Sequence, residues 1–328
     1  MKFDKKYYKK IIDNYKYNEI DGFLKVSSAE AKRRWISSYN LKAFIDGYEN
    51  KEKTLFIMGV GINEAPHLGT VMQLLNAIYL QQIGFEVNII LGDLDVYGAR
   101  SIELKKIENI TKKYERFIVN LGFDTNKGII RTQYNRDDII KTSYILSSFI
   151  DDKDFYEIEE DINDLYLKEH VYEGMKFSVK QSIALMFADF IHPGLKEGYK
   201  HVIVLSGIDE HGYTWKADQI RKRMDIPMTI SGLHTKILPG LNEFPKMSKS
   251  LKKSSINVDI SKKELEQLLL KNDKYIDNLI IQFMCNVSYY SLDQIRVITN
   301  NYNNKNLEWK KDKEKYVKDL YEICKKWK

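Results

Sequence analysis

Residues 54–92 read TLFIMGVGINEAPHLGTVMQLLNAIYLQQIGFEVNIILG, and this stretch decides the fold class. It opens with a short apolar run, 54–58, that is typical of a buried strand. A second strand is predicted at 87–91. Strand, helix and strand within about forty residues predict a βαβ unit, and hence a parallel sheet with a right-handed crossover. The helix between them is indicated by apolar residues that share one face, namely Leu68, Val71, Leu74, Leu75 and Ile78.

Helices and strands continue to alternate along the chain. A helix is predicted over 101–121, with Gly122 as its C-cap, and another over 176–191. Strands are predicted at 201–205 and 228–230, separated by a further helix. We therefore expect an α/β protein built on a Rossmann-like parallel sheet.

The pattern also suggests how the chain is divided. Residues 1–50 show helical spacing and are expected to form a helical N-terminal extension. The sheet domain is expected over 51–260, with a connective insertion around 140–175, and a small helical C-terminal domain over 261–328. Residues 151–164 carry eight acids, so we expect that part of the insertion to be solvated.

Composition narrows the class of protein. The chain of 328 residues is 43% hydrophobic and 30% charged, with five prolines, which argues against long disordered linkers. Its two cysteines, Cys285 and Cys324, are too few for a disulfide framework and lack metal-ligand spacing. Without a secretory signal or a membrane-length apolar stretch, we expect a cytoplasmic protein that does not enter membranes. The net charge of +6 suits a polyanion such as RNA, but an AT-rich genome would equally explain it.

The loop after the first strand carries residues suited to phosphate binding. Ligands of parallel sheets lie beyond the carboxyl ends of the strands, where a helix N-terminus offers free amides and a positive dipole. Gly59 and Gly61 would let a nucleotide approach the backbone, and His67 could hydrogen-bond triphosphate oxygens. A lone histidine at a helix start is more often a capping or packing residue. Glu64 stands where a dinucleotide fingerprint has its third glycine, which argues against a dehydrogenase.

A second candidate segment follows about 180 residues later, at Lys246-Met247-Ser248-Lys249-Ser250. Two lysines three residues apart, interleaved with hydroxyls, are suited to clamp a pyrophosphate leaving group. A Lys/Ser pentamer taken alone is usually a solvated basic loop. Its combination with Pro-His-Leu-Gly on a βαβ unit favours a nucleotide site instead.

Together these two segments resemble the class I aminoacyl-tRNA synthetases. His67-Leu68-Gly69-Thr70 is similar to their HIGH signature, with Thr70 in place of the second histidine, and 246–250 matches KMSKS letter for letter. Within the class, the chain resembles the tryptophanyl/tyrosyl branch in its archaeal and eukaryotic form. The resemblance covers roughly residues 50–260 and rests on the segments 92–97, 122–127, 207–210, 237–241 and 254–256.

The resemblance implies ATP-dependent amino-acid activation in the catalytic domain 51–260. An amino-acid carboxylate attacks the α-phosphate of ATP, pyrophosphate leaves, and the adenylate esterifies the 3′ end of a tRNA. Positioning and charge stabilisation carry such a reaction. Mg²⁺ would arrive with ATP rather than in a protein cage, and the branch works as homodimers. The implied catalytic residues are His67, Thr70, Lys246 and Lys249, and the implied ATP-binding residues are Gly59, Gly61, His67, Gly69, Gly207, Asp209, Met247 and Ser248.

The amino acid is indicated less directly, and the candidate residues for its site are Ile57, Asp95, Gln181, Ala184 and Glu210. Tyrosyl enzymes carry an aspartate three residues after the glutamine that Gln181 matches, and Ala184 stands there instead. Without that partner a substrate phenol would lack a hydrogen bond, so tyrosine is disfavoured. Tryptophan is preferred, with Asp95 and Gln181 as its polar contacts. Ile57 replaces an aromatic that tryptophanyl enzymes tend to have, and both Ile57 and Ala184 are equally well explained as core residues.

Two alternatives to a tRNA-charging enzyme stay open. One is a paralogue that activates tyrosine or another amino acid for a biosynthetic pathway, because few residues remain after 256 for an anticodon-binding domain. The other is a catalytically silent relative, which the intact lysine loop disfavours. Residues 305–328 hold nine lysines against five acids, and this helix either contacts the tRNA backbone or presents a solvated face.

Overall fold

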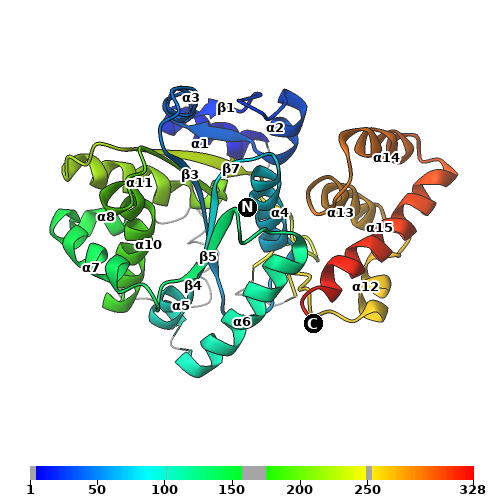
Figure 1. Ribbon diagram of the computed structural model, residues 1–328. Helices are drawn as coiled ribbons and strands as arrows, with labels where there is room; N and C mark the ends of the chain where they lie inside the picture. Colours follow the sequence, from blue (N-terminus) through cyan, green and yellow to red (C-terminus); the bar gives the residue numbers. More distant parts are fainter. Residues whose placement is uncertain (1–4, 101, 157–174, 249–252) are drawn as a thin grey trace.

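The computed structural model describes residues 5–100, 102–156, 175–248 and 253–328. Its centre is a seven-stranded sheet in the order β1-β2-β7-β6-β3-β4-β5, in which β3 to β7 run parallel (Figure 1). The strand order reverses between β3 and β6, so ligands are expected at the carboxyl ends of these two strands. The parallel strands are β3 (Thr54–Gly61), β4 (Val87–Gly92), β5 (Gly128–Thr132), β6 (His201–Gly207) and β7 (Thr229–Thr235).

The βαβ unit predicted from residues 54–92 is confirmed. β3 leads into α4 (Leu68–Gln82), and α4 leads into β4, which pairs with β3 in parallel from Phe56 opposite Val87 to Gly61 opposite Gly92. The predicted α/β fold with a Rossmann-like parallel sheet is therefore correct.

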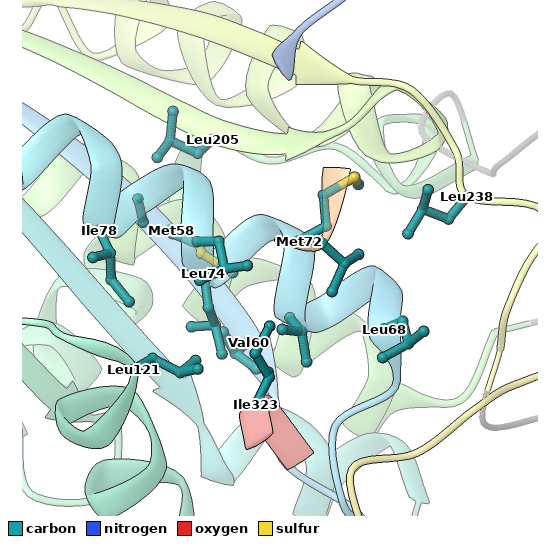
Figure 2. Packing of buried hydrophobic residues seen from close by; sticks show 14 of the residues in the cluster. Met58, Val60, Leu68, Met72, Leu74, Ile78, Leu121, Leu205, Leu238 and Ile323 are labelled. Carbon is teal, nitrogen blue, oxygen red and sulfur yellow. The ribbon is translucent and has the colours of Figure 1, made fainter. Parts of the chain in front are cut away.

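Helices cover both faces of the sheet and form two hydrophobic cores. α4 and α6 (Leu104–Leu121) cover one face, and Figure 2 shows their side chains packed against Met58 and Val60 of β3. α10 (Phe177–Lys196) and α11 (His211–Arg223) cover the other face (Figure 1). Two more helices, α5 (Asp93–Arg100) and α7 (Asp137–Leu146), pack against α10.

The connective region is less solvated than its acidic composition predicted. Asp154, in the short helix α8 (Asp152–Tyr156), is fully buried. Lys216 lies 3.0 Å from it and Arg223 donates to it as well, so two cations of α11 hold this carboxylate in the interior. The expectation of a solvated stretch is wrong at Asp154. Residues 157–174, about half of the predicted insertion, lie outside the described residues.

The N-terminal extension is not wholly helical, which corrects another expectation. Its helices are α1 (Lys5–Tyr15), α2 (Ser28–Arg34) and α3 (Leu41–Glu49), and between them lie the strands β1 (Asn18–Glu19) and β2 (Ser37–Tyr39). β1 pairs with β2 and β2 pairs with β7, both antiparallel, so the extension widens the central sheet. Strands of two and three residues are too short to show an alternating pattern, and sequence reasoning missed them for that reason.

The C-terminal region is helical, as predicted. Its core is continuous with that of the sheet, because Ile323 joins the cluster around Val60 and Leu121 (Figure 2) and Trp327 packs edge-on against Tyr114 of α6. The division into three domains stays a prediction. Within the ranges that the structure describes, no helix has the length and apolar character needed to cross a membrane. The four helices are α12 (Lys262–Leu269), α13 (Lys274–Asn286), α14 (Leu292–Asn304) and α15 (Leu307–Lys325).

Candidate active site

Glycines expose the backbone of β3 at its carboxyl end. Gly59 and Gly61 follow Ile57 at two-residue steps, so all three face the α10 side of the sheet. A Cβ placed on Gly59 would meet no atom of the described residues within 4 Å, and one on Gly61 would first meet Val96 Cγ2 at 3.9 Å. Open backbone therefore lies where ligands of parallel sheets bind.

His67 is the N-cap of α4, and its orientation is fixed locally. Its Nδ1 accepts the Thr70 amide at 3.3 Å, so in the neutral imidazole Nε2 carries the proton and is the donor. A Cβ on Gly69 would stand 2.9 Å from His67 Cε1, which explains why glycine occupies this position. A donor nitrogen and the positive end of the α4 dipole thus meet at one place.

The chain after the lysine loop pairs with the histidine segment. His67 forms an antiparallel bridge with Asn257. Backbone hydrogen bonds of 3.0 Å flank this bridge on both sides, one of them from Leu68 to the carbonyl of Ile256. The histidine segment and the chain that follows the lysine loop, far apart in the sequence, are therefore neighbours in the fold.

Hydrogen bonds close the root of the lysine loop. The Ser248 amide donates to Ser254 Oγ at 3.1 Å, and that hydroxyl donates to the Ser248 carbonyl at 3.0 Å. Both serines and Met247 are buried, so this part of the loop is anchored to the domain. Lys249 and Ser250 lie outside the described residues, and their roles stay predictions.

Asp209 and Lys246 form an ion pair beyond the end of β6. Asp209 lies in the turn Ile208–Glu210, and its Oδ2 is 3.0 Å from Lys246 Nζ. The two side chains are 13% and 10% exposed, so water screens the pair weakly. A Cβ on Gly207 would collide with the Asp209 carboxylate, which explains the glycine there. Glu210, a candidate for the amino-acid site, ends the same turn.

The other candidates for the amino-acid site are divided between the sheet, α5 and α10. Ile57 is fully buried in the core beneath α10, whereas Ala184 is half-buried and Gln181 is exposed on α10 itself. Asp95 lies in α5, and the Ser182 hydroxyl of α10 donates to its carbonyl at 3.2 Å. These contacts bring α5 and α10 together, while Ile57 lies among core residues.

A buried polar network beside Asp95 escaped the sequence reasoning. Gln133 directly follows β5, and its Nε2 donates to Asp95 Oδ2 and to Asp189 Oδ2, both at 2.8 Å. Arg131 of β5 donates to the other oxygen of Asp189 at 2.7 Å. Burial, and then the nearby Asp189, raise the pKa of Asp95 well above its usual range. The sequence contained one signal, since Gln133 stands at the carboxyl end of a strand.

The N-terminal extension supports the turn that follows β6. The Tyr17 hydroxyl lies 2.9 Å from His211 Nδ1, and the Tyr8 hydroxyl accepts the Ile237 amide at 3.2 Å. Ile208 is fully buried in a cluster with these two tyrosines. The extension therefore contacts the first residue of α11, which follows the Asp209 turn, and Ile237, which precedes the lysine loop. Sequence reasoning missed this role because residues 1–50 showed only a helical pattern, which does not reveal what they contact.

One cluster of described residues has ligand atoms close enough for a metal ion. Asp138, His192 and Glu197 offer atoms within 4.8 Å of one another. The Arg136 guanidinium donates to both carboxylates at 2.8 Å and already supplies the balancing positive charge. We assign this cluster to the structural contact between α7 and α10.

Comparison with known proteins identifies the family. The family model for tRNA synthetases class I (W and Y) matches residues 56–327. Over 172 residues the chain is 23% identical to a tryptophan–tRNA ligase of Hyperthermus butylicus, covering 51% of this chain and 42% of that protein. Over 212 residues it is 24% identical to a tyrosine–tRNA ligase of Methanosarcina barkeri, covering 62% and 61%. The chain spans less than two thirds of the length of these curated relatives.

A solved structure has the same fold over nearly the whole chain. The tryptophanyl-tRNA synthetase homolog from Entamoeba histolytica superposes with a TM-score of 0.77 at 16% identity, over 98% of this chain and 91% of that one. At this identity the likeness concerns the fold alone. The family model, in contrast, matches the sequence from β3 to the last helix. The chain therefore belongs to the class I tRNA synthetases of the tryptophan and tyrosine type.

Proposed function

We propose that the chain activates an amino acid with ATP, releases pyrophosphate and transfers the aminoacyl group to a tRNA, with tryptophan as the preferred amino acid. The observation that carries this proposal is the bridge between His67 and Asn257. It joins the histidine segment to the chain that follows the lysine loop, which supports a single site where groups suited to hold a triphosphate and groups suited to receive pyrophosphate act together.

His67 and Thr70 are the proposed contacts of the triphosphate. The Nε2–H of His67 donates to a phosphate oxygen while negative charge moves toward the leaving group, and the Thr70 hydroxyl adds a second donor. Gly59 and Gly61 leave room for the adenosine against the backbone of β3. Mg²⁺, carried with ATP, would neutralise the phosphates further.

Asp209 and Lys246 are proposed to exchange partners when ATP binds. In the structure they neutralise each other at 3.0 Å, which limits the cost of holding two weakly solvated charges. With ATP bound, the ribose hydroxyls would donate to Asp209, and Lys246 would turn toward the pyrophosphate together with Lys249. The same ion pair therefore prepares both groups for the nucleotide.

The ion pairs of the lysine-rich helix α15 favour a solvated lysine face over a contact with tRNA. Lys311, Lys315 and Lys325 each pair with an acid three or four positions away on the same helix. The apolar side chains of this helix and of the residues just after it are buried, namely Trp309, Tyr316, Leu320, Ile323 and Trp327. We therefore propose that the tRNA acceptor end approaches the catalytic domain and does not depend on α15.

We further propose a cytoplasmic homodimer that contacts its second copy through the β5 edge. β5 is the last strand of the sheet, and apolar side chains stand exposed on it and beyond it, at Ile129, Tyr134 and Tyr144. A second copy would cover both these side chains and the unpaired strand edge. Sedimentation equilibrium should give twice the chain mass, and Tyr144→Glu should shift the equilibrium toward the monomer.

The decisive experiment is pyrophosphate exchange with each standard amino acid, followed by aminoacylation of total tRNA. Exchange that is fastest with tryptophan, and charging of tRNA, would support the proposal. Exchange without charging would point to the paralogue that serves another pathway. Absence of exchange with every amino acid would refute amino-acid activation.

A further inference from the structure

The carboxylate of Asp95 lies on the glycine-lined face of the sheet. A Cβ on Gly92 would stand 3.1 Å from Asp95 Oδ2, and Gly92 pairs with Gly61 of β3. Asp95 is therefore one strand away from the open backbone at Gly59, on the same face. Its Oδ1 is buried and has no hydrogen-bond partner among the described residues. A buried oxygen left in this state costs free energy, and its place indicates a ligand contact.

Gln133 holds Asp95 by two separate groups. Its Oε1 accepts the Asp95 amide at 3.1 Å, and its Nε2 donates to Asp95 Oδ2 at 2.8 Å. These bonds fix both the start of α5 and the orientation of the carboxylate. Oδ2 is thereby occupied, and Oδ1 is the oxygen left to face a ligand.

The backbone amide and both side-chain polar groups of Gln133 are hydrogen-bonded. The residue is 1% exposed, and its backbone N–H donates to Asp93 Oδ1 at 2.9 Å. The second hydrogen of its side-chain Nε2 is directed to Asp189. Asp189 is anchored in turn by Arg131. The orientation of the Gln133 amide follows from these partners, because a flipped amide would face two carboxylates with its oxygen.

We propose that Gln133 is a positioning residue of the amino-acid site, which holds Asp95 so that Oδ1 faces the side chain of the substrate and accepts its hydrogen bond, in the ionised carboxylate that such a donor favours. The inference rests on the proposed function, because the substrate is taken to be the amino acid that is activated. It names the substrate class as an amino acid whose side chain carries an N–H or O–H donor. A side chain of the same shape without the donor would leave Oδ1 unpaired.

The test compares wild type with Gln133→Met, which keeps the volume of the side chain and removes both hydrogen-bonding groups. Pyrophosphate exchange is measured with tryptophan and with its benzothienyl analogue, in which sulfur replaces the indole N–H. In the variant, kcat/KM for tryptophan should fall by about 10- to 100-fold, since Asp95 is no longer held in place. The preference for tryptophan over the analogue should fall as well, while the KM for ATP should not change.

Gln81→Met is the matched control. Gln81 is also buried, and its amide also makes two bonds, to the carbonyl and the amide of Asp124, at 2.9 and 2.8 Å. Its substitution removes equivalent bonds away from Asp95, so it should leave the preference for tryptophan unchanged. Should Gln133→Met fail to fold, Gln133→Asn keeps the amide but shortens the side chain by one methylene, and should lower the same preference.

A double-mutant cycle tests whether Gln133 acts through Asp95 or has only a structural role. If Gln133 acts through Asp95, Gln133→Met should have little further effect on kcat/KM in an Asp95→Asn background. Full additivity would overturn the inference, as would an unchanged preference for tryptophan in a folded Gln133→Met enzyme. Fastest exchange by wild type with an amino acid that has no side-chain donor would also overturn it, and would leave amino-acid activation standing. Absence of any exchange would remove the proposed function and the inference together.

Discussion

Gly59→Ala should affect protein stability and nucleotide binding in opposite directions, so it tests whether a ligand lies against β3. Gly59 does not have a positive φ, so alanine can adopt its backbone conformation. The new methyl group would meet no described atom within 4 Å. Replacing glycine within a strand lowers the entropy of the unfolded chain and should stabilise the protein by about 0.5–1 kcal/mol. The midpoint of thermal unfolding should therefore hold or rise by about 1–3 °C.

The same methyl group should impair nucleotide binding. Carbon atoms pack at about 3.5–4 Å, so a Cβ on Gly59 excludes ligand atoms from the backbone that they are proposed to approach. A displacement of about 1 Å at a reacting centre can cost about 100-fold in rate. We expect the KM for ATP to rise at least about 10-fold in pyrophosphate exchange, or kcat to fall by a similar factor.

Gly69→Ala provides a contrast within the same site. Its Cβ would stand 2.9 Å from His67 Cε1, so it should displace the imidazole and lower kcat even where ATP still binds. Calorimetry on both variants and exchange at varied ATP concentration separate the two effects. Wild-type KM and kcat in a folded Gly59→Ala enzyme would show that no substrate lies against this backbone.

Three further predictions concern Lys246, Tyr17 and His234. Lys246→Met should lower kcat for exchange by at least about 100-fold, because it removes a cation from the leaving group and leaves Asp209 unpaired; an unchanged kcat would exclude Lys246 from that role. Tyr17→Phe removes the hydroxyl at His211 Nδ1, and should cost about 1 kcal/mol in urea unfolding and raise the KM for ATP. Burial, and then His211, lower the pKa of His234 from 6.5 to about 3, so below pH 6.5 only the unfolded chain binds this proton. The free energy of unfolding should then fall by about 1.4 kcal/mol per pH unit between pH 6 and 4, and His234→Asn should show a shallower slope over that range.

The elements that could be predicted from the sequence are those with long, regular patterns. The helix that begins at Leu68 shows its apolar face over four turns, and the strands on either side of it are nearly all apolar. β1 and β2 have too few residues for a pattern, and pairing with β7 creates them. Pairing with a distant strand, rather than the local preference of the residues, determines that these two segments are strands.

The residues of the candidate site likewise include some that the sequence could identify and some that it could not. His67 and Lys246 could be singled out because each stands in a short segment whose residue types already suggest chemistry. Gln133 and Asp189 could not, because their environment depends on partners from distant parts of the chain, and a sequence does not reveal which polar residues will be buried together. Ile57 shows the converse, since a position that invited a role in specificity is fully buried in the core.

The bridge between His67 and Asn257 also bears on how such chains can vary in length. It fastens the two ends of the intervening polypeptide to each other, and the entropy of closing a loop grows only with the logarithm of its length. Doubling a flexible loop costs only about 0.6 kcal/mol. Insertions and deletions in the surface loops between these residues should therefore be tolerated, and the outer helices can diverge while the contact between the two phosphate-binding segments is kept.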